Sequence, residues 1–198
     1  QYSFQTTVRK RGKFRCDPRN CAFPPLWVRF SKKQVKGTPF AGQDRIKLVL
    51  PCQPKSRKHS EYILREYLVY RMFNILTDSS FRVRLVRLTL HDAGGKMDSI
   101  PCYSFFIEQD DDLARRISGK VYNATNVHPE DTQKQFMTLV EVFQYMIGNT
   151  DYSVSMPHNI TLFSTDPFQP PLAIPYDFDW SGAVGTSYSI PAESLGID

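Results

Sequence analysis

The fold is decided by residues 158–179, with the sequence HNITLFSTDPFQPPLAIPYDFD. Two short apolar runs, 160–163 and 172–175, flank a stretch rich in Pro, Asp and Ser. Apolar runs of this length separated by turn-forming residues predict a short β-hairpin. Asn159 directly precedes the first run, and Asp177 follows the second. We therefore expect these two polar side chains to lie side by side at the open end of the hairpin.

A long helix is predicted before this hairpin. Pro129 suits the first position of a helix, and Gly148 suits its end. Between them, apolar residues recur at helical spacing, namely Phe136, Leu139, Val140, Phe143 and Ile147. Asp151 comes just past this helix, so we expect it to face the open end of the hairpin.

The polar residues around the hairpin predict an oxygen-rich site. Asp151, Asn159, Asp177 and Asp179 would supply carboxylate and amide oxygens, which are the ligands that suit Mg²⁺. If a phosphate were bound there, the metal would offset its charge and Asp151 could accept a hydroxyl proton. Taken one at a time, the same residue types also serve as turn formers and helix caps.

The preceding part of the chain predicts a sheet with one helix. The expected elements are a strand or hairpin over 6–15 interrupted by Gly12, strands 26–30 and 45–50, a helix over 61–76, and strands 81–90 and 100–107. Ser60 is expected to cap the helix, and the nearly continuous apolar run of the last strand favours a central position in its sheet. An acidic connector, 108–112, leads to a short helix over 113–117. This order predicts an α+β chain with a sheet-rich first lobe, 1–109, and a helix-led second lobe, 110–198.

Composition and charge exclude several classes of protein. The 198 residues are 41% hydrophobic and 23% charged, which is typical of a globular domain and unlike collagen or a disordered chain. No apolar run approaches the ~20 residues that span a bilayer. Residues 1–58 carry 15 of the 25 Lys and Arg but only two of the 20 Asp and Glu. This basic front can attract phosphate, nucleic acid or an acidic protein, and the acidic remainder can hold hard cations.

Two charged residues fall within apolar patterns. Lys47 lies on the expected strand 45–50, where a solvated edge lysine is the plainer interpretation. Glu66 lies on the apolar stripe of the expected helix. A carboxylate among apolar side chains is costly unless it meets a cation. Lys47 is therefore a candidate partner for Glu66, and a nearby Arg or water is the alternative.

These features together resemble a known family. A strand lysine, a helix glutamate, an apolar strand running into an acidic connector, and an Asp…Asn…Asp-Phe series are similar to a protein-kinase-like fold. The closer resemblance is to the atypical spore-coat-protein-H-type (CotH) kinases, whose ending is similar to residues 151–179 here. The resemblance covers about residues 40–182. It implies an α+β, protein-kinase-like architecture with a sheet-rich N-terminal lobe and a short helical C-terminal lobe, either minimal or truncated.

The resemblance also implies an activity, which is ATP- and Mg²⁺-dependent phosphoryl transfer to protein hydroxyls, with both ligands bound between the lobes. It implies that Lys47 contacts the nucleotide phosphates, that Glu66 pairs with Lys47, and that the hinge around Glu108 binds adenine. Asp151 would be the catalytic base. The implied metal ligands are Asn159, Asp177 and Asp179.

Two other functions stay open. The basic front could bind an acidic protein or a polyanion as a non-catalytic kinase-like module. His158, with the Asp residues around the hairpin, could instead hold a transition metal for phosphoester hydrolysis. The aromatic residues of the basic front are expected to fill the core of the sheet, so nucleic acid is not an expected partner.

The four cysteines bear on the cellular compartment. None of them forms a CxxC pair, so structural zinc is not expected. Cys21 precedes one expected strand and Cys52 ends another, which would permit a disulfide, although the sequence does not choose among the possible pairings. A bridge would favour a secreted or extracytoplasmic setting.

Overall fold

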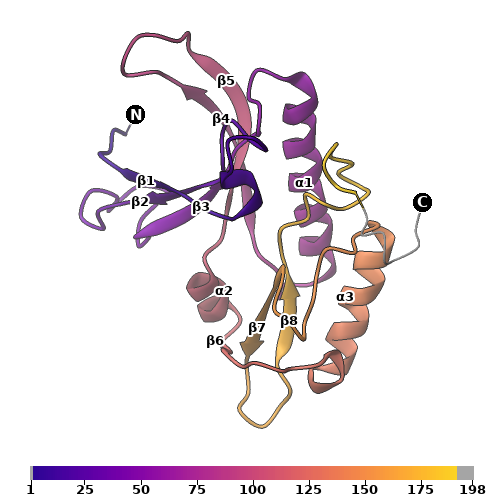
Figure 1. Cartoon of the computed structure of the whole chain (residues 1–198). Coiled ribbons are helices and arrows are strands. Elements are labelled where there is room, and N and C mark those ends of the chain that lie inside the picture. Colours follow the sequence, from indigo (N-terminus) through magenta and orange to yellow (C-terminus); the bar gives the residue numbers. More distant parts are fainter. Residues whose placement is uncertain (1, 191–198) are drawn as a thin grey trace. The chain divides into compact units, whose positions relative to one another are not determined.

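The computed structural model describes residues 2–190 and has an α+β fold (Figure 1). Its α-helices are α1 (Arg57–Leu76), α2 (Asp110–Arg116) and α3 (Lys134–Met146), and its strands form two antiparallel sheets. The described chain divides into two compact units. Unit 1 comprises the residues up to Leu64 together with Val83–Gln109, and unit 2 comprises Arg65–Arg82 and the residues from Asp110 onward. The division falls within α1.

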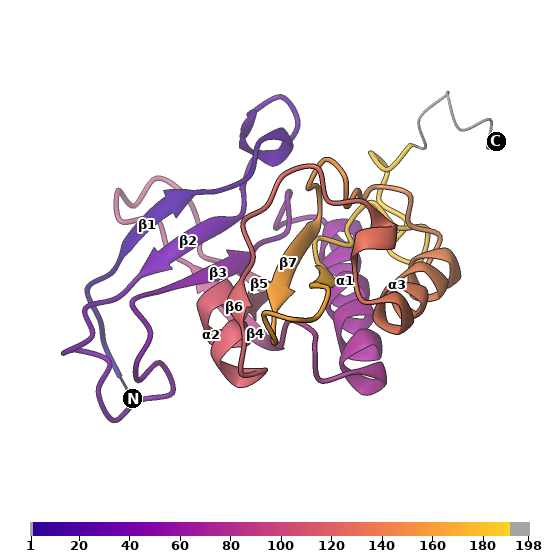
Figure 2. The same ribbon diagram turned by 90° about the horizontal axis from the view of Figure 1, so that it is seen from below.

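Unit 1 contains a five-stranded antiparallel sheet. Its strands are β1 (Thr7–Lys10), β2 (Leu26–Arg29), β3 (Arg45–Val49), β4 (Val83–Leu90) and β5 (Ile100–Ile107). Their order in the sheet is β1-β2-β3-β5-β4, and β1, β2 and β3 lie side by side in Figure 2. The central place predicted for 100–107 is confirmed, because β5 pairs with both β3 and β4.

Alternation along β3 separates an apolar face of the sheet from a face that carries Lys47. Leu48 and Leu50 form a buried cluster with Val28 of β2 on one face. Since successive strand residues point to opposite faces, Lys47 lies on the other face. The register places Lys47 between Trp27 of β2 and Ile107 of β5.

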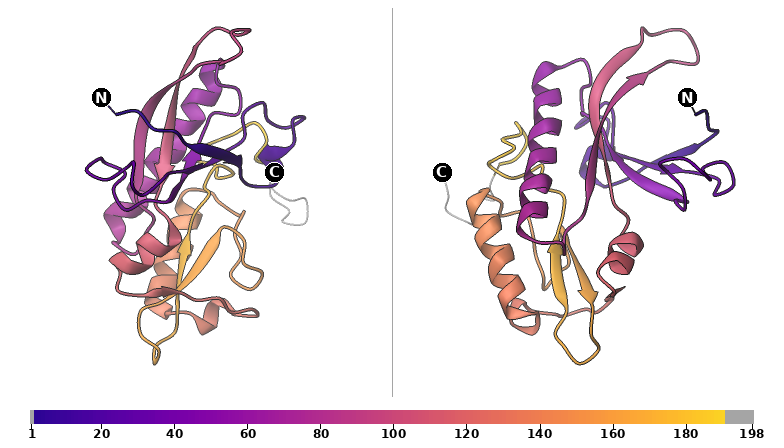
Figure 3. Two further views of the ribbon diagram at one scale, coloured as in Figure 1. Left: turned by 90° about the vertical axis from the view of Figure 1, so that its left-hand side faces the viewer. Right: turned by 180° about the vertical axis from the view of Figure 1, so that it is seen from behind.

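Unit 2 is built around the predicted hairpin. Its strands β7 (Ile160–Ser164) and β8 (Leu172–Pro175) confirm the prediction, and the short strand β6 (Lys120–Val121) adds to the edge of β7. The hairpin lies between α3 on one side and α2 on the other (Figure 3). Buried aromatic rings fill this unit, with Phe143 of α3 4.7 Å from Phe73 and 5.8 Å from Phe178 between ring centroids.

The structure corrects two predicted elements in the first half of the chain. Residues 6–15 are predicted as a strand or hairpin interrupted by Gly12; the interruption is confirmed by the Gly12 φ of +84°, but the only strand within these residues is Thr7–Lys10, and Phe14–Cys16 forms a 3-10 turn. The helix begins at Arg57 instead of residue 61. Ser60 is inside it, not at its cap, since the Ser60 N–H donates to the Ser56 carbonyl.

Two further boundaries are wrong in the second half. Asp110, Asp111 and Asp112, which were assigned to a connector, form the first turn of α2, where carboxylates are favoured by the helix dipole. Pro129 begins a separate 3-10 turn, Pro129–Asp131, and α3 starts at Lys134. The extended backbone of Thr132 separates the two, and the Gln133 side chain caps α3 by accepting from the Phe136 N–H.

Among the cysteines, the structure pairs Cys21 with Cys52, whose Cα atoms lie 4.9 Å apart. This separation lies within the range that disulfides require. The bridge joins the segment before β2 to the segment after β3, and Cys16 and Cys102 are free thiols. Within residues 2–190, no helix is both long enough and apolar enough to cross a membrane.

Candidate functional site

The end of α3 places the first residues of the site. Gly148 adopts a left-handed φ of +61° directly after the helix. Its N–H donates to the Tyr145 carbonyl, and the N–H of Asn149 donates back to the Gln144 carbonyl. This pair of bonds is a Schellman motif, which glycine permits because it has no Cβ. The motif stops α3 and directs Asn149 and Asp151 toward the hairpin.

Asp151 and Asn159 are joined directly. The Asn159 Nδ2 donates to the Asp151 backbone carbonyl at 2.7 Å and to the Asp151 Oδ2 at 2.9 Å. Asn159 is buried and has a positive φ of 52°, a conformation that Asn tolerates better than most residues. The prediction that Asp151 faces Asn159 is therefore confirmed, with the amide fixing both the backbone and the carboxylate of Asp151.

His158 holds the second oxygen of Asp151. The His158 Nε2 lies 2.9 Å from the Asp151 Oδ1. A bridge between Ser153 and His158, with backbone bonds in both directions, closes the loop that separates Asp151 from the hairpin. Each carboxylate oxygen still has a further lone pair after these contacts, so Asp151 remains able to accept a proton.

Asp177 and Asp179 follow β8 and have different surroundings. The Tyr176 N–H donates to the Asn159 carbonyl, which places Asp177 one residue beyond the position opposite Asn159. Asp177 has a positive φ of 62°, and its N–H donates to the Tyr70 hydroxyl. Asp179 is buried, and its Oδ2 accepts from the Tyr188 hydroxyl at 2.9 Å.

The predicted Mg²⁺ ligands were tested by their donor chemistry. Within residues 2–190, no group of three or more His, Cys, Asp or Glu side chains is placed to hold a metal ion. This finding gives no support to the transition-metal cluster of His158 with the Asp residues. Mg²⁺ requires fewer protein ligands, because it commonly binds through one or two carboxylates together with waters and substrate phosphates. Asp177 and the Asn159 amide oxygen fit that requirement, since neither accepts a bond from another described residue.

In unit 1, Lys47 belongs to a cluster of cations around Trp27. The Lys47 Nζ lies 5.9 Å from the Trp27 ring centroid, and the guanidinium carbons of Arg45 and Arg11 lie 5.0 and 5.7 Å from it. Lys47 is only 6% exposed, so the expectation of a solvated edge lysine is wrong. Three basic side chains therefore gather around one ring on this face of the sheet.

The other two residues predicted to contact the nucleotide belong to different units of the chain. Glu108 directly follows β5 in unit 1 and is half-buried. Glu66 is buried and belongs to unit 2. Because Lys47 and Glu66 belong to different units, the Lys47–Glu66 ion pair stays a prediction.

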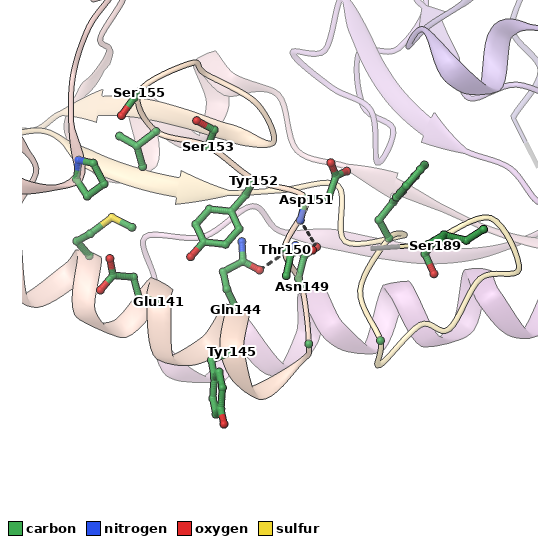
Figure 4. Close-up of a pocket in the computed structure, with 17 residues that line it drawn as sticks. Glu141, Gln144, Tyr145, Asn149, Thr150, Asp151, Tyr152, Ser153, Ser155 and Ser189 are labelled. Carbon is green, nitrogen blue, oxygen red and sulfur yellow. Dashed lines mark hydrogen bonds between the residues drawn. The ribbon is translucent and has the colours of Figure 1, made fainter. Parts of the chain in front are cut away.

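A pocket of about 720 Å³ lies beside Asp151 within unit 2 (Figure 4). It is lined by α3, by the loop from Gly148 to Ser155, and by residues after β8. In Figure 4 the ring of Tyr152 stands between Glu141 and Asn149. Burial, together with the negative charge of Glu141, raises the pKa of the Tyr152 hydroxyl, so that group is neutral at physiological pH.

The sequence interpretation missed Gln144, which connects this pocket to Asp151. The Asn149 Nδ2 donates to the Gln144 Oε1 at 3.0 Å, and the Asp151 N–H donates to the Asn149 Oδ1 at 3.1 Å. Gln144 is 1% exposed. The signal was present in the sequence, because Gln144 is a polar residue adjoining the apolar positions Phe143 and Ile147 of the predicted helix.

Comparison of the sequence with protein-family models and with curated proteins gave no match.

Proposed function

We propose that this protein is an atypical, CotH-like protein kinase that transfers the γ-phosphoryl group of ATP to protein hydroxyls. The observation that carries this proposal is the double hydrogen bond from the Asn159 amide to Asp151 at the open end of the β7–β8 hairpin. It fixes a half-buried carboxylate in one orientation, and the Asn159 amide oxygen accepts no hydrogen bond from another described residue. A phosphotransferase needs this arrangement, because its catalysis depends mainly on positioning and charge neutralisation.

In the proposed reaction, Asp151 is the base. The acceptor oxygen forms a bond to the γ-phosphorus while the bond from that phosphorus to the β-phosphate oxygen breaks and ADP leaves. The hydroxyl proton passes to the Asp151 carboxylate. Asn159 and His158 hold the two carboxylate oxygens, so Asp151 presents its remaining lone pairs without rotating.

Asn159 and Asp177 would hold Mg²⁺ through the amide oxygen and the carboxylate. Bound there, the ion would neutralise charge on the phosphates. Asp179 is a weaker candidate ligand, because its Oδ2 is engaged by Tyr188. The positive φ values of Asn159 and Asp177 support a functional role, since strained backbone is retained where the surrounding structure needs it.

The cation cluster of unit 1 supports the nucleotide part of the proposal. Lys47, with Arg45 and Arg11 around the same ring, would contact the phosphates, and the backbone at Glu108 would bind adenine. Residues 9–15, which would cover the phosphates, contain a single glycine, Gly12, so basic side chains would take the place of a glycine-rich backbone in binding them.

The proposal is tested with two variants and two measurements. Asp151→Asn should lower phosphate incorporation into casein by at least about 100-fold while leaving the Mg-ATP-dependent thermal stabilisation unchanged. Asp177→Ala should abolish the Mg²⁺-dependent part of that stabilisation. The matched control is Asp166→Asn, because Asp166 lies in the turn at the opposite end of the hairpin. Equal Mg-ATP binding by the parent and by Asp177→Ala would refute the metal assignment.

A second function is favoured by the same cations. A non-catalytic module could bind a polyanion at the Trp27 face. This function predicts that affinity for inorganic polyphosphate falls steeply with salt and is unaffected by Asp151→Asn. Phosphate incorporation that requires Asp151 would decide for the kinase.

A further inference from the structure

The pocket of unit 2 contains a buried hydrogen-bond donor that has no partner. The Gln144 Nε2 makes no hydrogen bond in the structure, although the residue is 99% buried. A buried donor without a partner costs about 1–3 kcal/mol in stability. Such atoms are rare in native proteins and call for a specific explanation.

The identity of this atom as nitrogen follows from its neighbours. The Asp151 backbone N–H can only donate, so the Asn149 side chain must turn its oxygen toward it. The Asn149 nitrogen then faces Gln144 and donates to the Gln144 Oε1. The NH₂ group is therefore the part of the Gln144 amide that has no partner. In Figure 4 it lies beside Tyr152 among the side chains that line the pocket.

The lining of the pocket restricts the charge of a ligand. Its charged residues are Glu141 and Asp151, and no Lys, Arg or His is among the described residues that line it. A carboxylate or phosphate ligand would be repelled by both side chains. The pocket also differs in this respect from the Trp27 face of unit 1, which attracts anions.

The remaining lining restricts the shape of a ligand. Met137, Tyr152, Val154 and Trp180 supply apolar and aromatic surface to the pocket that Gln144 also lines. The volume of about 720 Å³ is that of a small-molecule site. A planar aromatic molecule with one acceptor oxygen would accept a hydrogen bond from the buried donor while its ring contacts these side chains.

We propose that this pocket binds a small, non-anionic aromatic or amphipathic molecule whose carbonyl oxygen accepts a hydrogen bond from the Gln144 Nε2. The pocket shares Asp151 with the proposed catalytic site, but binding of a ligand to Gln144 does not require kinase activity. Because Asn149 connects Gln144 to Asp151, a ligand here would also contact the network that orients Asp151.

The test uses three molecules of nearly equal shape on the full chain. Benzamide is neutral and carries a carbonyl acceptor, benzoate carries the same acceptor with a negative charge, and benzamidine is a cation without an acceptor. Benzamide should bind with a dissociation constant of about a millimolar and shift the side-chain NH₂ resonances of Gln144 in nuclear magnetic resonance spectra. Benzoate should bind at least about tenfold more weakly. Benzamidine, which has no acceptor, should not cause the downfield shift of the Gln144 NH₂ resonances that a hydrogen bond to a carbonyl oxygen produces.

Two substitutions separate binding from folding. Gln144→Met removes the donor, and with it the acceptor of the Asn149 amide, with little change in volume, and it should weaken the binding of benzamide by about twofold to tenfold. Glu141→Gln keeps the donor but removes one negative charge from the lining. It should therefore reduce the ratio of the benzoate dissociation constant to the benzamide dissociation constant. A benzamide complex that leaves the Gln144 resonances unmoved, an equal affinity for benzoate, or no binding of benzamide at millimolar concentration would each overturn the proposal.

Discussion

Reduction of the Cys21–Cys52 disulfide should destabilise the protein by an amount that the structure allows us to calculate. The bridge closes a loop with a sequence separation of 31 and holds the segment before β2 against the segment after β3. In the chain-entropy model, closing a loop of this length lowers the conformational entropy of the unfolded chain. This raises the free energy of the unfolded state by about 3–4 kcal/mol. Breaking the bridge returns that freedom to the unfolded state and lowers the free energy of unfolding.

The measurement is urea-induced unfolding followed by circular dichroism, with and without a phosphine reductant. With an m-value of about 2 kcal/mol/M, reduction should move the midpoint down by about 2 M. Cys52→Ser should reproduce the reduced curve without any reductant. The double variant Cys16→Ser/Cys102→Ser is the matched control, because it removes the two free thiols and leaves the bridge.

Two results would refute this reasoning. The first is an unchanged midpoint on reduction, in a sample shown by peptide mapping to contain the Cys21–Cys52 bridge before reduction. The second is a peptide map of the oxidised protein that places Cys16 in the bridge. Either result would contradict the pairing or its effect on the unfolded chain.

Three other substitutions have defined outcomes. Phe143→Ala should lower the free energy of unfolding by about 3–5 kcal/mol in urea titrations, because it empties a fully buried ring position of unit 2. Burial and the Glu141 charge raise the pKa of Tyr152 above 10.0, so Glu141→Gln should lower that pKa. The measurement is a tyrosinate absorbance titration, with Tyr152→Phe as the control that identifies the signal of Tyr152. Because the raised pKa favours the neutral hydroxyl in the folded state, the stability that Tyr152 contributes is present below pH 10.0 and is lost as the pH rises through the raised pKa. Gly119→Ala should lower the melting temperature, since the new Cβ would lie 2.7 Å from the Ser164 carbonyl oxygen; an unchanged melting temperature would contradict this close approach of the two backbone segments.

The sequence predicted the elements well where hydrophobic patterning is strong. The β7–β8 hairpin and strand β5 were found with nearly correct bounds, because apolar runs between turn-forming residues are a local signal. The helix starts were predicted poorly. Ser60 has the chemistry of a cap, but its N–H is used inside α1, and only the path of the preceding chain decides which of several capping residues is used.

The candidate site was predicted in part. The proximity of Asp151 and Asn159 followed from the order of helix and hairpin, and the structure adds the double hydrogen bond. Gln144 was missed, because its function depends on the orientation of Asn149, which is set by a backbone N–H beyond the helix. The cations around Trp27 were also missed as a cluster, since Arg45 and Lys47 come next to Trp27 only when β3 pairs with β2.

The sequence by itself determined the α+β class, the hairpin with its polar flanks, and the excess of positive charge in the first 58 residues. These properties depend on the periodicity and composition of short segments, which are local. The tertiary structure alone decided which cations share the Trp27 ring, which cysteines are bridged, and which amide nitrogen is left without a partner in the pocket. Each of these depends on the distance between atoms that the chain brings together only when it folds, and the residue types on their own do not specify that distance.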